Sequence, residues 1–88
     1  MNEIKFRAYL TKTGHSEKSI NSRISKLRSI ENYFQLNIDT IITNKERIIS
    51  LLINIRNSGI EERRHTPFSN ALRKYYTCMT NDEIGRIF

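Results

Sequence analysis

The stretch SEKSINSRISKLRSIENYF, residues 16–34, decides the fold class of this chain. Its apolar side chains recur at intervals of 4, 3, 3 and 4 residues, which is the periodicity of one face of an α-helix. The residues on that face are Ile20, Ile24, Leu27, Ile30 and Phe34. Ser16 precedes them as an N-cap, and Glu17 complements the helix dipole in the first turn. The stretch therefore predicts a long helix that packs one face into a core.

Two further helices are predicted on either side of this one. Residues 3–12 place Phe6, Tyr9 and Leu10 on one stripe, and Gly14 follows as the left-handed residue after a helix. Downstream, Thr43-Asn-Lys-Glu46 matches a capping box and opens a helix. Its inward residues are expected to be Ile48, Leu51, Leu52 and Ile55. Gly59 and Ile60 then predict a Schellman motif that ends this helix.

The last third of the chain predicts a long helix and a short one. Thr66-Pro67 combines an N-cap hydroxyl with a proline at the first helical position. The apolar face that follows consists of Phe68, Ala71, Leu72, Tyr75, Tyr76 and Met79. Thr80-Asn-Asp-Glu83 is a second capping box, which predicts a short final helix carrying Ile84, Ile87 and Phe88. With no period-two pattern, the sequence predicts an all-α fold: one domain, residues 1–88, forming a compact bundle of four main helices plus a short C-terminal helix.

The charge of the chain is strongly basic and unevenly distributed. Lys and Arg number 15 against 9 Asp and Glu, which gives a net charge of +6 and a pI near 9.8. Residues 1–36 hold seven of these cations against three Glu, a net charge of +4. An excess of this kind on one segment is typical of a protein that binds the phosphate backbone of nucleic acid. The alternative is that the charge serves solubility alone.

Several classes of function are not expected from the residue types present. Cys78 is the only cysteine, so no internal disulfide can form and a cytoplasmic location is favoured. No apolar run approaches a membrane span, and the charged N-terminus does not match a signal peptide. His15 and His65 have no partners at metal-ligand spacing. No phosphate loop, catalytic carboxylate pair or Ser/His/Asp set is present, so we expect no enzyme activity, cofactor, metal or small-molecule ligand.

The outer face of the residue 16–34 helix is the best candidate for a binding surface. Opposite the apolar face lie Lys18, Ser22, Ser25 and Ser29. Lys26 borders this strip, and Arg23 and Arg28 lie on opposite flanks. Serine lets a helix approach phosphates closely and donates to their oxygens, while Lys and Arg supply charge. The alternative is an ordinary solvated face.

A second basic site precedes the helix that begins at Thr66. It comprises Arg63, Arg64 and His65, and Arg73 and Lys74 continue it along the helix. Glu61 and Glu62 lie directly before it, so local salt bridges are an alternative explanation.

Two stretches resemble the SAM-like core-binding domain of tyrosine recombinases and phage integrases. They are Phe6-Arg-Ala-Tyr-Leu10 with Gly14-His-Ser-Glu-Lys-Ser-Ile-Asn-Ser-Arg-Ile-Ser-Lys-Leu27, and His65-Thr-Pro-Phe-Ser-Asn-Ala-Leu-Arg-Lys-Tyr-Tyr76. The resemblance implies a four- or five-helix bundle that forms half of a clamp around DNA, with its second and fourth helices facing the duplex. Matched by position, it implicates Ser16, Lys18, Ser19, Ser22, Arg23, Lys26, Thr66, Ser69, Asn70 and Arg73. Arg64 joins this set from the second basic site, and Arg23 stands where the family commonly has Tyr.

The sequence thus predicts a non-catalytic module that contacts double-stranded DNA, as part of or accessory to a recombinase, integrase or other DNA-processing system. The catalytic residues of that family are not among the 88 residues, so strand cleavage is not expected. The alternative is a small phage- or plasmid-encoded protein-interaction factor that inhibits or regulates a nucleoprotein enzyme. Such a factor would dock on a partner, or on a second copy, through Ile84, Ile87 and Phe88.

Overall fold

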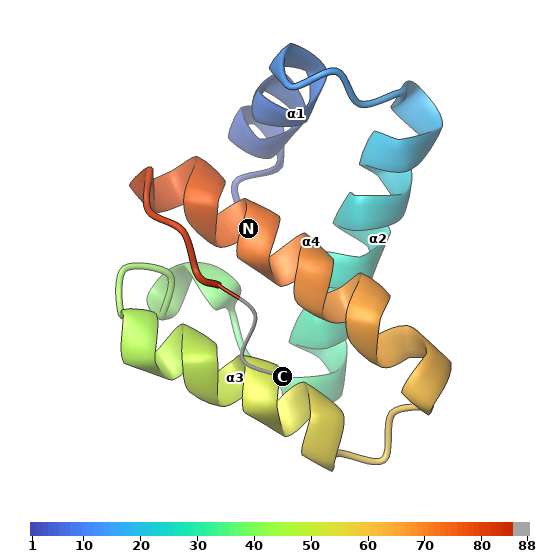
Figure 1. The fold of residues 1–88 in the computed structure, drawn as a ribbon, viewed down its shortest axis with the longest axis vertical. Helices are drawn as coiled ribbons and strands as arrows, with labels where there is room; N and C mark the ends of the chain where they lie inside the picture. The colour runs from blue at the N-terminus through green and yellow to red at the C-terminus, as the bar shows by residue number, and fades with distance from the viewer. Residues whose placement is uncertain (86–88) are drawn as a thin grey trace.

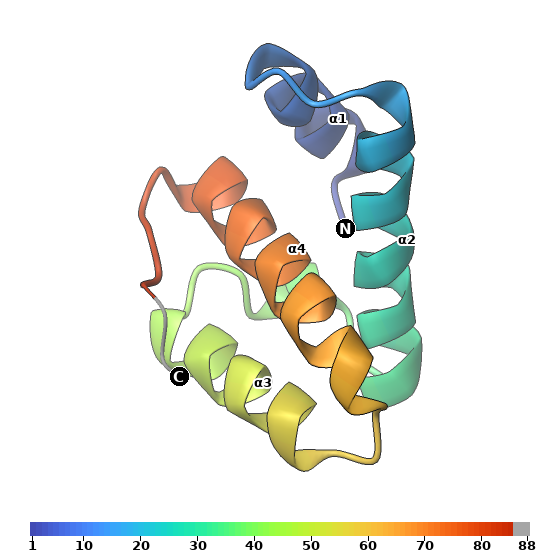
Figure 2. The same cartoon turned by 45° about the vertical axis from the view of Figure 1, so that its right-hand side comes forward.

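A computed structural model gives the fold of the chain and describes residues 1–85. Four α-helices and one 3-10 turn follow one another along the chain. They are α1 (Glu3–Lys12), α2 (Glu17–Phe34), η1 (Ile38–Thr40), α3 (Lys45–Asn57) and α4 (Glu62–Thr80). In Figures 1 and 2, α4 crosses the molecule between the other helices and packs against α1, α2 and α3. No strand forms within residues 1–85, so the all-α prediction is confirmed for the part described.

The helix predicted from residues 16–34 forms as α2, with the expected ends and buried face. The Ser16 hydroxyl accepts a hydrogen bond from the Ser19 amide at 3.2 Å, which satisfies one free N–H of the first turn. Gln35 is left-handed, with φ 53°, and ends the helix. Phe34 is half-buried, and the fully buried positions of α2 are Ile20, Ile24, Leu27 and Ile30.

The buried faces of all four helices join in one hydrophobic core. Phe6 from α1 and Tyr75 from α4 are both fully buried, and their rings meet edge to face with centroids 5.2 Å apart. Tyr76, a member of the predicted apolar face, is also buried, and so is Cys78. Burial raises the pKa of the Cys78 thiol, which disfavours the reactive thiolate.

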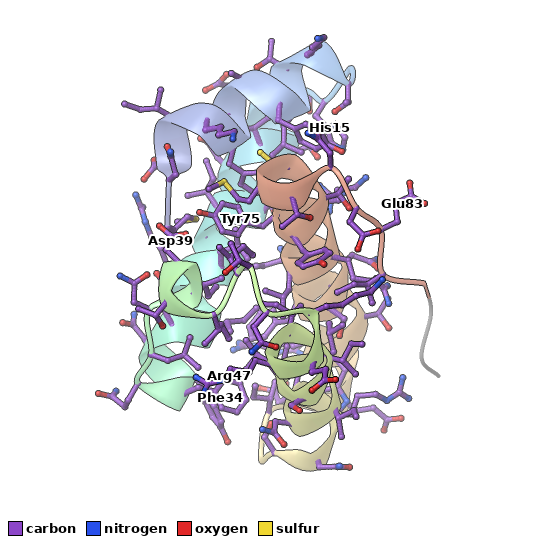
Figure 3. The ribbon with its side chains drawn as sticks, turned by 90° about the vertical axis from the view of Figure 1, so that its left-hand side faces the viewer. His15, Phe34, Asp39, Arg47, Tyr75 and Glu83 are labelled. Atoms are coloured by element: carbon purple, nitrogen blue, oxygen red, sulfur yellow. The ribbon has the colours of Figure 1, made fainter. Side chains whose placement is uncertain are left out.

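Tyr75 also carries a buried polar link between distant parts of the chain. Its hydroxyl accepts from the Asn2 amide at 2.6 Å and donates to the Asp39 carboxylate. Burial, together with the hydrogen bond to Asp39, raises the pKa of the Tyr75 phenol, so it stays a proton donor. Figure 3 shows Tyr75 and Asp39 directed toward each other, so the link fixes α4 relative to η1 and the start of the chain.

Both predicted ends of the third helix are wrong. The side chain of Asn44, not that of Thr43, caps α3 by accepting from the Arg47 amide at 3.2 Å. Asn is among the strongest N-cap residues. A hydrogen bond from the Asn44 amide to the Ile41 carbonyl closes a turn that places Asn44 at the start of the helix. At the other end Ser58 is extended and Gly59 has no positive φ, so no Schellman motif forms. The Gly59 amide instead donates to the Tyr33 hydroxyl at 3.1 Å.

The prediction that the fourth helix starts at Thr66-Pro67 is also wrong. α4 begins four residues before Thr66, at Glu62, and Pro67 lies inside it. Proline there removes one backbone hydrogen bond but fits the helical φ, so the helix continues through it. His65 supports the early start, because its Nε2 bonds the Ile60 carbonyl at 2.8 Å.

The short last helix predicted from Thr80 does not form within the described residues. Thr80 ends α4, Asn81 is left-handed with φ 59°, and residues 82–85 are not helical. Ile84 is buried in the core at 8% exposure, so the predicted docking surface does not include it. Ile87 and Phe88 lie outside the described residues.

Candidate nucleic-acid interface

The crossing of α2 and α4 leaves a surface hollow of about 290 Å³, which we call the α2–α4 groove. Figure 2 shows the two helices side by side at this crossing. The groove is lined by Ser19, Ser22, Arg23, Lys26, Thr66, Pro67 and Asn70. Six of these seven residues were predicted as contacts to DNA, four on α2 and two on α4. The fold therefore brings the two predicted helical faces together in one place.

The α2–α4 groove is electropositive and polar. Two cations, two serines, a threonine and an asparagine line it, and none of the carboxylates in the described part of the chain does. Within residues 1–85, neither Arg23 nor Lys26 forms an ion pair. Lys26 donates from Nζ to the Ser22 hydroxyl at 2.6 Å, one turn away on the same helix. This bond holds the ammonium along the groove, where its charge remains available to an anion.

Two other arginines of α1 and α2, Arg7 and Arg28, are paired with carboxylates instead. The Arg28 guanidinium pairs with Glu3 of α1. The Arg7 guanidinium pairs with two carboxylates: its Nε lies 3.5 Å from Glu3 Oε1, and its Nη1 lies 3.3 Å from Glu17 Oε1. Arg23 and Arg28, predicted on opposite flanks of the helix, thus have different roles. Arg23 lines the groove without an ion pair within residues 1–85, whereas the ion pair of Arg28 with Glu3 links α2 to α1.

A second hollow of about 260 Å³ adjoins the groove and shares Arg23 and Asn70 with it. Its other lining residues are Tyr9, Arg73, Lys74, Thr77, Glu83 and Ile84. The Arg73 guanidinium donates to the side-chain oxygen of Asn70, which joins two successive turns of α4. We call this second hollow the Arg23 pocket.

The Arg23 side chain occupies an unusual position between the two hollows. Its Nε is buried and has no hydrogen-bond partner within residues 1–85. A buried N–H without an acceptor costs about 1–3 kcal/mol, and more for a charged group. Such a donor favours any ligand that supplies an acceptor.

The other predicted contact residues lie outside both hollows. Ser16 is used as the N-cap of α2, and Lys18 is exposed on its first turn. Arg64 lines a separate hollow of about 210 Å³ that also includes Glu61. Ser69 is buried at 8% exposure, so its prediction as a DNA contact is wrong: it belongs to the inward face of α4.

Comparison of the chain with protein-family models, curated proteins and solved structures finds no match. The site must therefore be interpreted from its own residues. Within residues 1–85, no three His, Cys, Asp or Glu side chains come together as metal ligands, and no helix is long and apolar enough to cross a membrane.

The structure also brings residues to the site that were not predicted as contacts to DNA. Tyr9 and Thr77 reach the Arg23 pocket from α1 and α4, and Glu83 reaches it from the segment after α4. Thr77 follows Asn70 by seven residues, so helical spacing could have found it. Glu83 could not have been found, because its position depends on how the segment after α4 folds back.

That segment is attached to the bundle through Asp82. Lys45 donates to the Asp82 carboxylate at 3.2 Å, the Tyr76 hydroxyl donates at 3.1 Å, and the Glu83 amide donates at 2.9 Å. The bond from Lys45, followed by those from the Glu83 amide and Tyr76, holds the pKa of Asp82 below its usual value. Together with the buried Ile84, these bonds place Glu83 at the Arg23 pocket.

Proposed function

We propose that this protein is a non-catalytic module that binds duplex DNA through the α2–α4 groove, as part of or accessory to a recombinase, integrase or other DNA-processing system. The observation that carries the proposal is the groove itself: two helices converge on a hollow with cations and small hydroxyls, and no carboxylate of residues 1–85 lines it. Small hydroxyls let the helix backbones approach the phosphates, and the cations provide attraction.

The length of the groove suits a short tract of DNA backbone. Ser19 and Lys26 are seven residues apart on α2, which corresponds to about 10 Å of helix. One DNA strand rises about 3.4 Å per nucleotide along the duplex axis, so a groove that runs parallel to this axis covers about three nucleotides. The module then makes few phosphate contacts, and its affinity alone is modest and sensitive to salt. The resemblance to core-binding domains, which use the same two helices, supports this arrangement.

A single added carboxylate tests the proposal. Ser22→Glu places a negative charge in the groove, whereas Ser50→Glu places one on the exposed face of α3. We expect Ser22→Glu to weaken binding to a labelled 20-base-pair duplex about tenfold or more at 50 mM salt, because a favourable contact is replaced by repulsion. Ser50→Glu should have little effect.

Two other results would count against binding of DNA through the groove. If the wild-type protein shifts no duplex at 50 mM salt and co-purifies with a protein partner, the interaction-factor alternative is favoured instead. If both Glu variants bind as the wild type does, DNA binds elsewhere on the molecule.

A further inference from the structure

The Arg23 pocket, which adjoins the α2–α4 groove, has the lining and the volume of an anion-binding site of its own. Among residues 1–85, the cationic side chains that line it are Arg23, Arg73 and Lys74, and the carboxylate that lines it is that of Glu83. Its volume of about 260 Å³ exceeds that of several waters at about 30 Å³ each, so a tetrahedral oxyanion with solvent fits. An anion there would face cations from both α2 and α4.

Two donors in the pocket lack an acceptor within residues 1–85. The Arg23 Nε is buried without a partner. The Asn70 side-chain oxygen accepts from Arg73, which leaves the Asn70 amide nitrogen to donate, and no bond from that nitrogen forms within the described residues. A guanidinium presents a planar fork of N–H groups that matches two oxygens of a phosphate. A small reorientation of Arg23 toward an oxyanion would give its buried N–H an acceptor.

Of the carboxylates in residues 1–85, Glu83 alone lines the pocket, and its neighbours set its position. Asp82 is bonded to Lys45 and Tyr76, and Ile84 is buried in the core. Glu83, between them, is exposed at the edge of the pocket. Its charge lowers the attraction of the pocket for any anion.

We propose that the Arg23 pocket binds one phosphate group, with the Arg23 guanidinium as central donor, the Asn70 amide as a second donor, and Glu83 as a competing anion at the rim. The phosphate is taken to be a backbone phosphodiester next to those in the α2–α4 groove, and in this respect the proposal rests on the proposed function. The same chemistry would also recognise a free phosphate.

The test uses the whole protein and two probes, inorganic phosphate and a 16-base-pair duplex with 5′-hydroxyl ends. Two-dimensional ¹H–¹⁵N NMR follows the Arg23 Nε–Hε and Asn70 side-chain amide signals. We expect both probes to shift both signals in a saturable manner. Arg23→Lys keeps the charge but loses the fork, so it should abolish the Asn70 shift with either probe, while Arg47→Lys on α3 should preserve it.

The carboxylate at the rim gives an independent measurement. Glu83→Gln should tighten phosphate binding about two- to fivefold, as expected for removal of one exposed like charge. Glu46→Gln removes the same charge from the exposed first turn of α3 and should leave the affinity unchanged.

The outcomes separate the two proposals. If the duplex shifts the amides of residues 19–26 but neither probe shifts Arg23 Nε or Asn70, the pocket is not a phosphate site and the proposed function stands. If phosphate shifts both signals and the duplex shifts none, the pocket binds a free phosphate group and the proposed function fails. Equal Asn70 shifts in the wild type and Arg23→Lys would overturn the role of Arg23.

Discussion

Removal of both groove cations, Arg23→Ala with Lys26→Ala, should change how DNA binding depends on salt. Each phosphate that a cation neutralises contributes about 0.9 to the slope of log affinity against log salt. Two lost contacts therefore reduce the magnitude of the slope by about 1.8. Between 50 and 200 mM salt, a slope of 1.8 corresponds to about a twelvefold change in affinity. The wild type should lose about twelve times more affinity than the variant over this range.

Fluorescence anisotropy of a labelled 20-base-pair duplex at several salt concentrations measures this slope. Lys5→Ala with Arg47→Ala is the matched control, because it removes the same charge from exposed positions on α1 and α3. Thermal melts should show both double variants folded, since Arg23 and Lys26 form no ion pair within residues 1–85. Equal slopes for the two double variants would show instead that net charge, and not the groove, governs binding.

Three further predictions concern the fold. Asn44→Ala should destabilise the protein by about 1 kcal/mol through loss of the α3 cap, and Thr43→Ala by much less, as measured by urea unfolding. Gly14→Ala should cost about 1 kcal/mol because Gly14 has φ +88°, whereas Gly85→Ala, with no strained φ and no close neighbour, should cost little; equal losses would contradict this. The pKa of Asp82 is lowered in the folded state, so its contribution to stability is complete above its usual pKa of about 3.9 and is lost as the pH falls further. Asp82→Asn should therefore flatten the acid side of the urea-midpoint profile, and an unchanged profile would exclude this role.

The faces of the helices could be predicted from sequence, whereas their ends could not. Ile20, Ile24 and Leu27 are buried because apolar periodicity follows directly from packing one side of a helix. Helix ends depend on small energies that neighbouring segments change. Thr43 and Asn44 can both cap a helix, and Asn81 stops α4 where a capping box predicted a new start.

The candidate site likewise combines residues that the sequence could predict with residues that it could not. The α2 side of the groove follows from the angular position of Ser22 and Lys26, which the sequence alone determines. Ser69 was included by its position in the resemblance, although Leu72 and Tyr76, at helical spacings from it, already indicated an inward face. Glu83 reaches the Arg23 pocket only through the fold of the segment after α4, and no local pattern carries that information.

Mapping backbone amide shifts while a short duplex is added to the ¹⁵N-labelled protein shows whether DNA binds through the α2–α4 groove. At low salt we expect saturable shifts concentrated at the groove, on residues 19–26 of α2 and 66–70 of α4, with α3 unaffected. Absence of shifts, or shifts centred on α3 or on the exposed face of α1, would contradict binding of DNA through the α2–α4 groove.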